Sequence, residues 1–329
     1  MRVGGRLALP ALLAVALWIN PALVLAQPAP HLGAGSRFMR IAGLPTDGEV
    51  WARDALDTPA QWRLLVVPGS GCVSLTSSMN RLAHSLRHAQ VLLLQKPHLA
   101  PGTQAVDAAC SHEFIAADNL ADWQSRAIRL ARQSLAATDS TLPLVLAGLS
   151  EGAELLPGLV QALPEAEALV MVGNAGLDPA TVAGLQADRL GAGAAWQRLM
   201  RAAAGSPSPQ RLLEGRNLRY WQVLLDWPLQ AALLADPRPL LHAWGGHDAL
   251  IPAAAFARFA AAARQRSGGY CALQFPAADH QLRTADNDEL QSLWALLDQA
   301  ASRRRQTAAA SMPGWPTDCA GWLAPTVGP

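Results

Sequence analysis

The feature that most constrains the fold of this chain is an alternation between short apolar runs and longer amphipathic stretches. The apolar runs are continuous, which is typical of strands covered by helices on both faces. The amphipathic stretches place apolar residues at helical spacing. An α/β fold with a mostly parallel sheet is therefore expected. The expected strands are 64–67, 91–94, 144–147, 168–172, 240–244 and 270–275, the expected helices are 78–87, 120–135, 253–264 and 286–303, and segments 38–41 and 50–55 form a hairpin-like start.

One stretch interrupts this alternation. Residues 177–236 lie between two expected strands and are far more numerous than a crossover needs. They have a helical pattern with several large apolar side chains, and an insertion of this kind on a rigid sheet is typical of a cap over a pocket. The aromatic residues of the insertion equally serve to pack it onto the core. Because 51% of the 329 residues are hydrophobic, we expect 27–329 to form one main domain that includes this cap.

The charge balance excludes one class of partner. The formal net charge is +1, whereas proteins that bind phosphate backbones have a strongly basic balance. Nucleic acid is therefore not an expected partner. Small molecules, lipids and peptides remain as candidates.

The N-terminus has the profile of a signal peptide. Two arginines precede an apolar run over 7–25, and small or modest side chains end at Ala26. We expect residues 1–26 to be removed, so that the mature chain begins at Gln27. The mature protein is then secreted or periplasmic, without stable insertion into a membrane.

An uncleaved N-terminal anchor is the alternative, because the run over 7–25 is nearly long enough to span a bilayer. Pro10 and Pro21 interrupt that run and favour cleavage. A structural envelope protein held by the same run is a further alternative. Finding whether the mature N-terminus is Gln27 distinguishes these cases.

The segment with the most specific chemistry covers 144–153, with the sequence Leu-Val-Leu-Ala-Gly-Leu-Ser-Glu-Gly-Ala. An expected strand ends there in Gly148-x-Ser150-x-Gly152 and leads directly into a helical pattern. In such a sharp turn, side chains at the positions two residues before and after the serine would collide, so both positions require glycine or another very small residue. The following helix directs its free N–H groups and positive dipole end toward an oxyanion. The pattern predicts Ser150 as a nucleophile.

This strand–motif–helix unit resembles the nucleophile turn of the α/β-hydrolase superfamily, and the resemblance covers nearly the whole mature chain in order of elements. It implies the α/β-hydrolase fold, a mostly parallel sheet covered by helices, with the helical cap inserted between strands. Residues 68–72, Pro-Gly-Ser-Gly-Cys, take the place of the oxyanion loop, where the superfamily usually has His-Gly. Because the donor in such loops is a backbone N–H, Ser70 and Glu151 are the candidate oxyanion donors. A glycine turn that only reverses the chain is the alternative.

The resemblance also implies an acid and a base, which follow the serine in that order. A serine hydroxyl is a weak nucleophile and needs a base held in one tautomer by a carboxylate. Expected strand 240–244 leads into Gly-Gly-His-Asp-Ala-Leu-Ile-Pro, which resembles the superfamily's acid loop, and Asp248 is the implied acid. Expected strand 270–275 leads into Pro-Ala-Ala-Asp-His-Gln-Leu, where the superfamily places its histidine, and His280 is the implied base.

Other residues compete for these roles. Asp279, beside the histidine, and Asp178, after the strand at 168–172, are the alternative acids. His247 adjoins the implied acid, but neighbouring side chains point apart. His98 and His112 follow a strand and are candidates to line the cleft, although solvated loop residues would have the same pattern.

Four cysteines form an even set in a chain that we expect to be exported, which favours disulfides over metal binding or thiol catalysis. Free buried thiols are the alternative, and the sequence alone allows three pairings. The topology of the resembled fold favours Cys72 with Cys110, because both follow the carboxyl ends of strands. It likewise favours Cys271 with Cys319, which a returning helix would deliver to the opposite edge of the sheet.

The resemblance implies acyl transfer to water, with a small-molecule or acyl substrate that carries an ester, thioester or amide. It implies no cofactor and no metal. Arg216 and Arg219 in the cap are candidates to bind a substrate carboxylate, or else form a solvated face. Two alternatives remain: a secreted serine peptidase, whose relatives share a motif like Gly-Leu-Ser-Glu-Gly, and a non-catalytic binding protein on the same fold.

Overall fold

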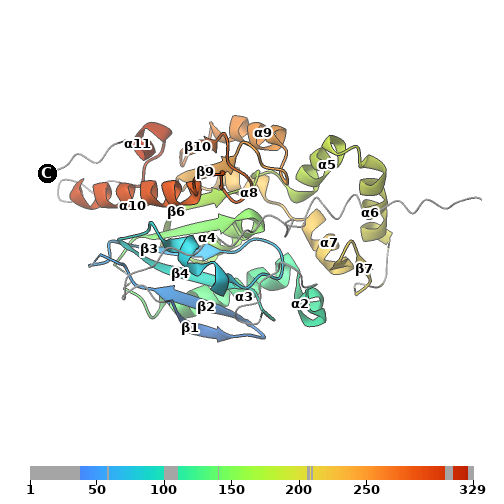
Figure 1. The fold of residues 1–329 in the computed structure, drawn as a ribbon, viewed down its shortest axis with the longest axis horizontal. Coiled ribbons are helices and arrows are strands. Elements are labelled where there is room, and N and C mark those ends of the chain that lie inside the picture. The colour runs from blue at the N-terminus through green and yellow to red at the C-terminus, as the bar shows by residue number, and fades with distance from the viewer. Residues whose placement is uncertain are drawn as a thin grey trace, which may run out of the picture.

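An eight-stranded, mostly parallel sheet forms the centre of this computed structural model (Figure 1). The structure describes residues 38–57, 59–99, 110–139, 141–205, 208, 210–307 and 314–324. The strand order is β1-β2-β4-β3-β5-β6-β9-β10; β2 pairs antiparallel with β1 and β4, and the other pairs are parallel. The strands are β1 (Met39–Leu44), β2 (Gly48–Arg53), β3 (Trp62–Val67), β4 (Ala89–Gln95), β5 (Leu144–Leu149), β6 (Ala166–Val172), β9 (Leu240–Gly245) and β10 (Tyr270–Phe275).

Helices cover both faces of the sheet because successive strand residues point to opposite sides. In β5, Leu144 and Leu146 belong to the core on one face, and Val145 and Ala147 belong to the core on the other. The first face is covered by α3 (Leu120–Leu135), α4 (Leu156–Ala162) and α9 (Ala253–Ala263), and the second by α1 (Met79–Ala83), α10 (Glu289–Thr307) and α11 (Cys319–Leu323). The shorter elements α2 (His112–Ala117), η3 (Leu75–Ser77) and η4 (Ser150–Leu155) lie in the connections between strands and helices.

This architecture confirms the α/β fold expected from the apolar runs. Each of the six expected strands is present, extended by at most two residues at either end. The helix expected over 120–135 has those bounds, and its start is defined by Asn119, whose side chain accepts a hydrogen bond from the N–H of Asp122. The helix expected over 78–87 is shorter than predicted and ends at Ala83.

In its described residues, the long insertion between β6 and β9 contains four helices and a small two-stranded sheet. Figure 1 shows α5, α6 and α7 grouped at one end of the molecule, with α7 near α2 and α3. Asp178 ties the start of the insertion to its end, because its Oδ1 accepts hydrogen bonds from the N–H groups of Leu229 and Gln230, both at 2.8 Å. The elements are α5 (Pro179–Arg189), α6 (Gly193–Gly205), β7 (Leu212–Leu213), β8 (Arg216–Asn217), α7 (Leu218–Leu225) and α8 (Gln230–Ala235).

The N-terminal segment with the signal-peptide profile, residues 1–26, lies outside the described residues. Within the described ranges, no helix combines the length and the apolar character needed to cross a membrane.

Candidate active site

Three side chains that follow three parallel strands meet at the carboxyl edge of the sheet. Ser150 follows β5, Asp248 follows β9 and His280 follows β10. Nε2 of His280 lies 3.0 Å from Oγ of Ser150, and Nδ1 of His280 lies 2.7 Å from Oδ2 of Asp248. When the Nδ1 proton is donated to the carboxylate, Nε2 presents its lone pair to the serine hydroxyl. The structure thus brings the expected nucleophile, base and acid into one hydrogen-bonded chain.

The turn that carries Ser150 is sharp and strained. Ser150 has a φ of 49°, a left-handed conformation that is rare for a residue with a side chain. A Cβ atom at Gly148 would lie 2.4 Å from Cα of Ala153, and one at Gly152 would lie 2.3 Å from the carbonyl oxygen of Val67. Glycine is therefore required at both positions, for the steric reason that the sequence motif predicts.

The element after Ser150 differs from a single helix. It begins as the 3₁₀ turn η4 and continues as α4, with Pro157 in the first turn of α4. Proline is tolerated there because the first N–H groups of a helix have no intrahelical acceptor. The helical pattern expected after the serine therefore takes the form of a tight turn followed by a short helix.

Asp248 is held rigidly against the base. Its Oδ1 accepts hydrogen bonds from the N–H groups of Leu250 and Ile251, both at 2.8 Å, and its Oδ2 faces the imidazole. The carboxylate is 2% exposed and the imidazole 13% exposed. Two glycines allow this approach. A Cβ atom at Gly245 would lie 2.1 Å from the carbonyl oxygen of Asp279, and one at Gly246 would lie 2.3 Å from that of Pro276, so the loops that carry Asp248 and His280 pack backbone against backbone.

The competing acids have other partners. Oδ1 of Asp279 accepts hydrogen bonds from the N–H groups of Gln281 and Arg283, at 2.8 and 2.9 Å, and so stabilises the histidine loop. Asp178 binds the start of α8, as described above. In this structure, Asp248 is the one of the three carboxylates that bonds the imidazole of His280.

The competing histidines have no bond to the serine in the described structure. The N–H of His247 donates to the carbonyl of Ala278, and the N–H of His98 donates to the carbonyl of Pro45. His112 is exposed and begins α2.

The expected oxyanion loop lies beside Ser150. A Cβ atom at Gly69 would lie 3.2 Å from Cβ of Ser150, so the loop after β3 and the turn after β5 are in van der Waals range. Ser70 follows directly in this loop, and Glu151 is the second residue of η4. Both expected donors are thus placed on segments that border the serine.

A buried group of charged and polar side chains borders the same turn, and no sequence pattern predicted that its members would lie together. Lys96 and Asp118 join Glu151, Arg216 and Tyr220 in this group. One signal was available in the sequence, since Lys96 is the only lysine among 329 residues. The pairing of Arg216 with Asp118 also means that its guanidinium is already bound within the protein.

The second candidate arginine of the insertion lies on the surface. Arg219 pairs with Asp122 at 3.1 Å, and both side chains are close to half exposed. Neither Arg216 nor Arg219 is therefore an unpaired cation at the site, and the structure gives no support to a carboxylate-binding role for this pair.

Asn174, after β6, supports the serine from the other side. Its Nδ2 donates to the carbonyl oxygen of Ser150 at 3.1 Å and to Oε1 of Glu154 at 3.0 Å. Burial, followed by the charge of Glu151, raises the pKa of Glu154 well above its ordinary value. Oε2 of Glu154 has no hydrogen-bond partner among the described residues. Burial therefore favours the protonated, neutral form of the Glu154 carboxyl in the folded protein.

The four cysteines form two disulfides, Cys72–Cys110 with a Cα–Cα distance of 5.5 Å and Cys271–Cys319 with 4.7 Å. This is the pairing implied by the topology of the resembled fold. The first bridge follows the loop that borders Ser150, and the second joins β10 to α11. In the described part of the chain, no group of three or more His, Cys, Asp or Glu side chains is arranged to hold a metal ion.

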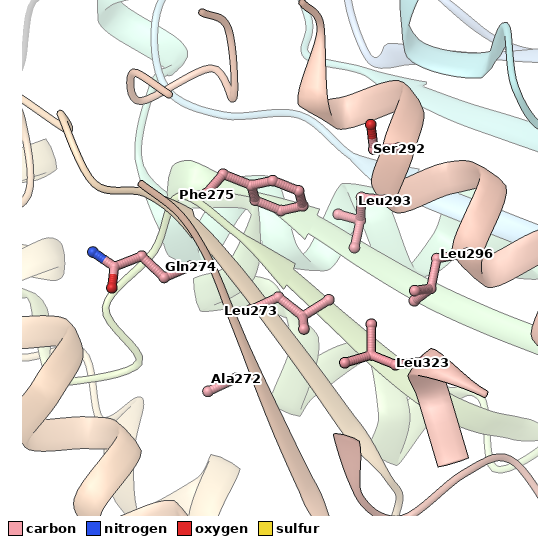
Figure 2. Close-up of a pocket in the computed structure, with 8 residues that line it drawn as sticks. All are labelled: Ala272, Leu273, Gln274, Phe275, Ser292, Leu293, Leu296 and Leu323. Carbon is pink, nitrogen blue, oxygen red and sulfur yellow. The ribbon is translucent and has the colours of Figure 1, made fainter. Parts of the chain in front are cut away.

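A cavity of about 320 Å³ opens beside the edge strand β10, between that strand, α10 and α11 (Figure 2). Figure 2 shows Leu273, Leu293, Leu296 and Leu323 turned toward one another, while Gln274 points away from them. None of Ser150, Asp248 and His280 lines this cavity. It is a separate apolar feature of the surface.

Comparisons with known proteins give structural similarity only. A scan of the sequence against protein-family models finds no match, and no curated protein matches it significantly. Among solved structures, an open-form lipase is similar with a TM-score of 0.57 and 14% identity, covering 82% of this chain and 99% of its own. Est1E from Butyrivibrio proteoclasticus, which has also been solved with ferulic acid bound, is similar with a TM-score of 0.52 and 13% identity. The match covers 84% of this chain and 100% of Est1E. The esterase domain of a Rhodothermus marinus protein is similar with a TM-score of 0.50 and 18% identity, and the match covers 78% of this chain and 92% of that domain. At these identities the similarity identifies the fold alone.

Proposed function

We propose that this chain, which has the α/β-hydrolase fold, is an exported serine hydrolase that cleaves an ester, thioester or amide through an acyl-enzyme. The observation that carries the proposal is the hydrogen-bonded chain from Ser150 through His280 to Asp248. Its serine sits on a strained turn at the carboxyl edge of a parallel sheet, where ligands of such sheets bind. A structural serine would have no need of this conformation or of these two partners.

In the proposed reaction, Oγ of Ser150 attacks the substrate carbonyl carbon while Nε2 of His280 takes the hydroxyl proton. The carbonyl oxygen becomes an oxyanion, which accepts hydrogen bonds from the backbone N–H groups of Ser70 and Glu151. The intermediate then expels the leaving alcohol, thiol or amine, which receives the proton from His280. Water, deprotonated by the same imidazole, hydrolyses the acyl-serine. Asp248 stabilises the imidazolium in both steps.

Carboxylic esters of small or lipid-like acids are the proposed substrates, ahead of thioesters and amides. The cap is rich in buried apolar side chains, among them Leu199, Trp221 and Leu224. The similar structures include esterases and a lipase, and one of them binds ferulic acid, a small aromatic carboxylic acid. These observations support a small acyl compound as the ligand class.

Export is part of the proposal. The signal-peptide profile of residues 1–26 and the two disulfides support a secreted or periplasmic site of action, because disulfides persist in oxidising compartments. The two bridges close chain segments of 38 and 48 residues. Bridges of this length stabilise an exported domain by restricting its unfolded state.

Activity-based labelling tests the function. The purified protein should react with a fluorophosphonate probe and hydrolyse p-nitrophenyl esters, and a series of acyl chain lengths should define its preference. Ser150→Ala should abolish labelling and hydrolysis while leaving the circular dichroism spectrum unchanged, because only the hydroxyl is removed. Labelling that persists in Ser150→Ala would exclude this nucleophile, and hydrolysis of peptides in place of esters would assign a peptidase.

A further inference from the structure

The one lysine of the chain is buried beside the nucleophile. Lys96 follows β4, is 3% exposed, and its Nζ lies 2.6 Å from Oε1 of Glu151 and 3.1 Å from Oδ1 of Asp118. Burial alone would lower the pKa of Lys96, but the two carboxylates outweigh burial and raise it. Isolated buried charges are costly, so such a group persists only when its partners are well placed.

Two cap residues complete this group. The hydroxyl of Tyr220, on α7, donates to Oε2 of Glu151 at 2.6 Å. Arg216, on β8, donates to Oδ2 of Asp118, and its guanidinium lies 4.5 Å from the centre of the Tyr220 ring. The charges of two cations and two carboxylates thus cancel. Burial, and after it the negative charge of Glu151, raises the pKa of the Tyr220 hydroxyl, so Tyr220 adds no charge to the group. The group has no excess charge with which to attract a substrate ion.

The geometry instead points to a role in holding Glu151. Each carboxylate oxygen of Glu151 is bound by a different element, Oε1 by the lysine after β4 and Oε2 by the tyrosine of the cap. A side chain bound at both oxygens restricts its own backbone. Glu151 is the second residue of η4, where N–H groups have no intrahelical acceptor, so its N–H is free to donate elsewhere.

We propose that Lys96 and Tyr220 are positioning residues of the acyl-transfer site, which hold the carboxylate of Glu151 so that its backbone N–H is aimed at the oxyanion. This inference rests on the proposed function. It assigns the insertion a task at the catalytic site, because α7 supplies one of the two contacts that fix the donor.

Such a role has a defined kinetic signature. The oxyanion exists after attack and not in the bound substrate, so a misaimed donor weakens the transition state more than the substrate complex. The turnover number should fall while KM stays nearly constant. A residue that only stabilises the fold would lower the amount of active protein and leave turnover per active site unchanged.

The test compares three variants of the full mature protein with the parent, using a p-nitrophenyl ester. Tyr220→Phe removes one hydroxyl bond to Glu151, and Glu151→Gln keeps the side-chain volume but removes its charge. Arg219→Gln is the matched control, because it breaks an exposed link between the same helix and α3 without touching Glu151. Active sites are counted by exhaustive fluorophosphonate titration, which corrects for any unfolded fraction.

We expect kcat per titrated site to fall about tenfold in Tyr220→Phe and in Glu151→Gln, the scale of losing a hydrogen bond to a charged group, with KM changed less than about twofold. The inhibition constant of a boronic acid analogue of the oxyanion should rise by the same factor as kcat falls. Arg219→Gln should match the parent. An unchanged kcat in either folded variant, or equal losses in Arg219→Gln, would overturn the proposal. A parent that neither labels nor turns over would instead refute the proposed function.

Discussion

Asp248 uses both of its carboxylate oxygens, and this distinguishes it from the two competing acids, Asp178 and Asp279, which accept their hydrogen bonds at Oδ1. Oδ1 is held by two backbone N–H groups, which leaves Oδ2 directed at Nδ1 of His280. The carboxylate is buried, so its hydrogen bond to the imidazole does not compete with water. A proposed acid with this geometry orients one tautomer of the base and stabilises its cation.

Exchanging this acid for its amide tests the assignment. Asp248→Asn should favour the wrong tautomer of His280 and lower kcat by roughly 10⁴-fold, the scale of that change in a serine protease. Asp279→Asn and Asp178→Asn should each change kcat by less than about tenfold, because both carboxylates accept backbone N–H groups elsewhere. Ester hydrolysis per titrated site is the measurement. If Asp248→Asn keeps near-normal turnover while one of the other two variants loses it, the acid of the triad is that other residue.

Glu154 makes the free energy of unfolding depend on pH. Its pKa is raised by burial and by Glu151, whereas in the unfolded chain it has the ordinary value. Above that ordinary value the folded state retains a proton that the unfolded state has lost. The contribution of Glu154 to the unfolding free energy therefore falls as the pH rises toward the raised pKa.

Glu154→Gln removes this pH-dependent contribution to the free energy of unfolding, because an amide does not titrate. The variant should gain stability relative to the parent as the pH rises from 5 to 8, by at most about 1.4 kcal/mol per pH unit. Urea denaturation at several pH values provides the measurement. Gln161→Ala, at an exposed position of α4, removes no titrating group and is the control, so its difference should not grow with pH. A constant difference for Glu154→Gln would mean that its carboxyl is ionised in the folded state.

The elements differ in how closely they follow local sequence. Helix α3 has its expected bounds because the Asn119 cap and the apolar spacing lie within the helix itself. The segment after Ser150 divides into η4 and α4 because Pro157 lacks an N–H and takes a first-turn position. The length and helical pattern of 177–236 predicted an inserted element, but the contact of α7 with the nucleophile turn depends on where the cap packs.

At the scale of the whole molecule, the two disulfides and the N-terminus belong to one prediction. We expect the exported protein to begin at Gln27 and to contain Cys72–Cys110 and Cys271–Cys319. Mass spectrometry of non-reduced peptides, together with N-terminal sequencing of protein from the culture medium or periplasm, measures both. Reduction should lower the unfolding free energy by about 2–5 kcal/mol for each bridge lost. Four free thiols, or a retained Met1, would contradict export with oxidative folding.

Local sequence patterns were enough to predict the layered α/β architecture and, through the resemblance that they carry, Ser150, Asp248 and His280 as site residues. Continuous apolar runs and helical spacing are local signals, because they record which faces of an element are covered. The carboxyl ends of parallel strands share one edge of the sheet. Residues that follow β5, β9 and β10 are therefore neighbours even though 130 positions separate Ser150 from His280.

Which side chains become hydrogen-bond partners depends on how distant parts of the chain pack together. Glu151 is bound by Lys96 and Tyr220, which are 55 and 69 positions away in the chain, and no local period relates them. Likewise, Asp178, Asp248 and Asp279 all lie near the ends of strands, and what distinguishes them is the set of N–H groups that each carboxylate meets in the packed loops. Hydrogen bonds act over about 3 Å, so their choice of partner is made by packing rather than by sequence pattern.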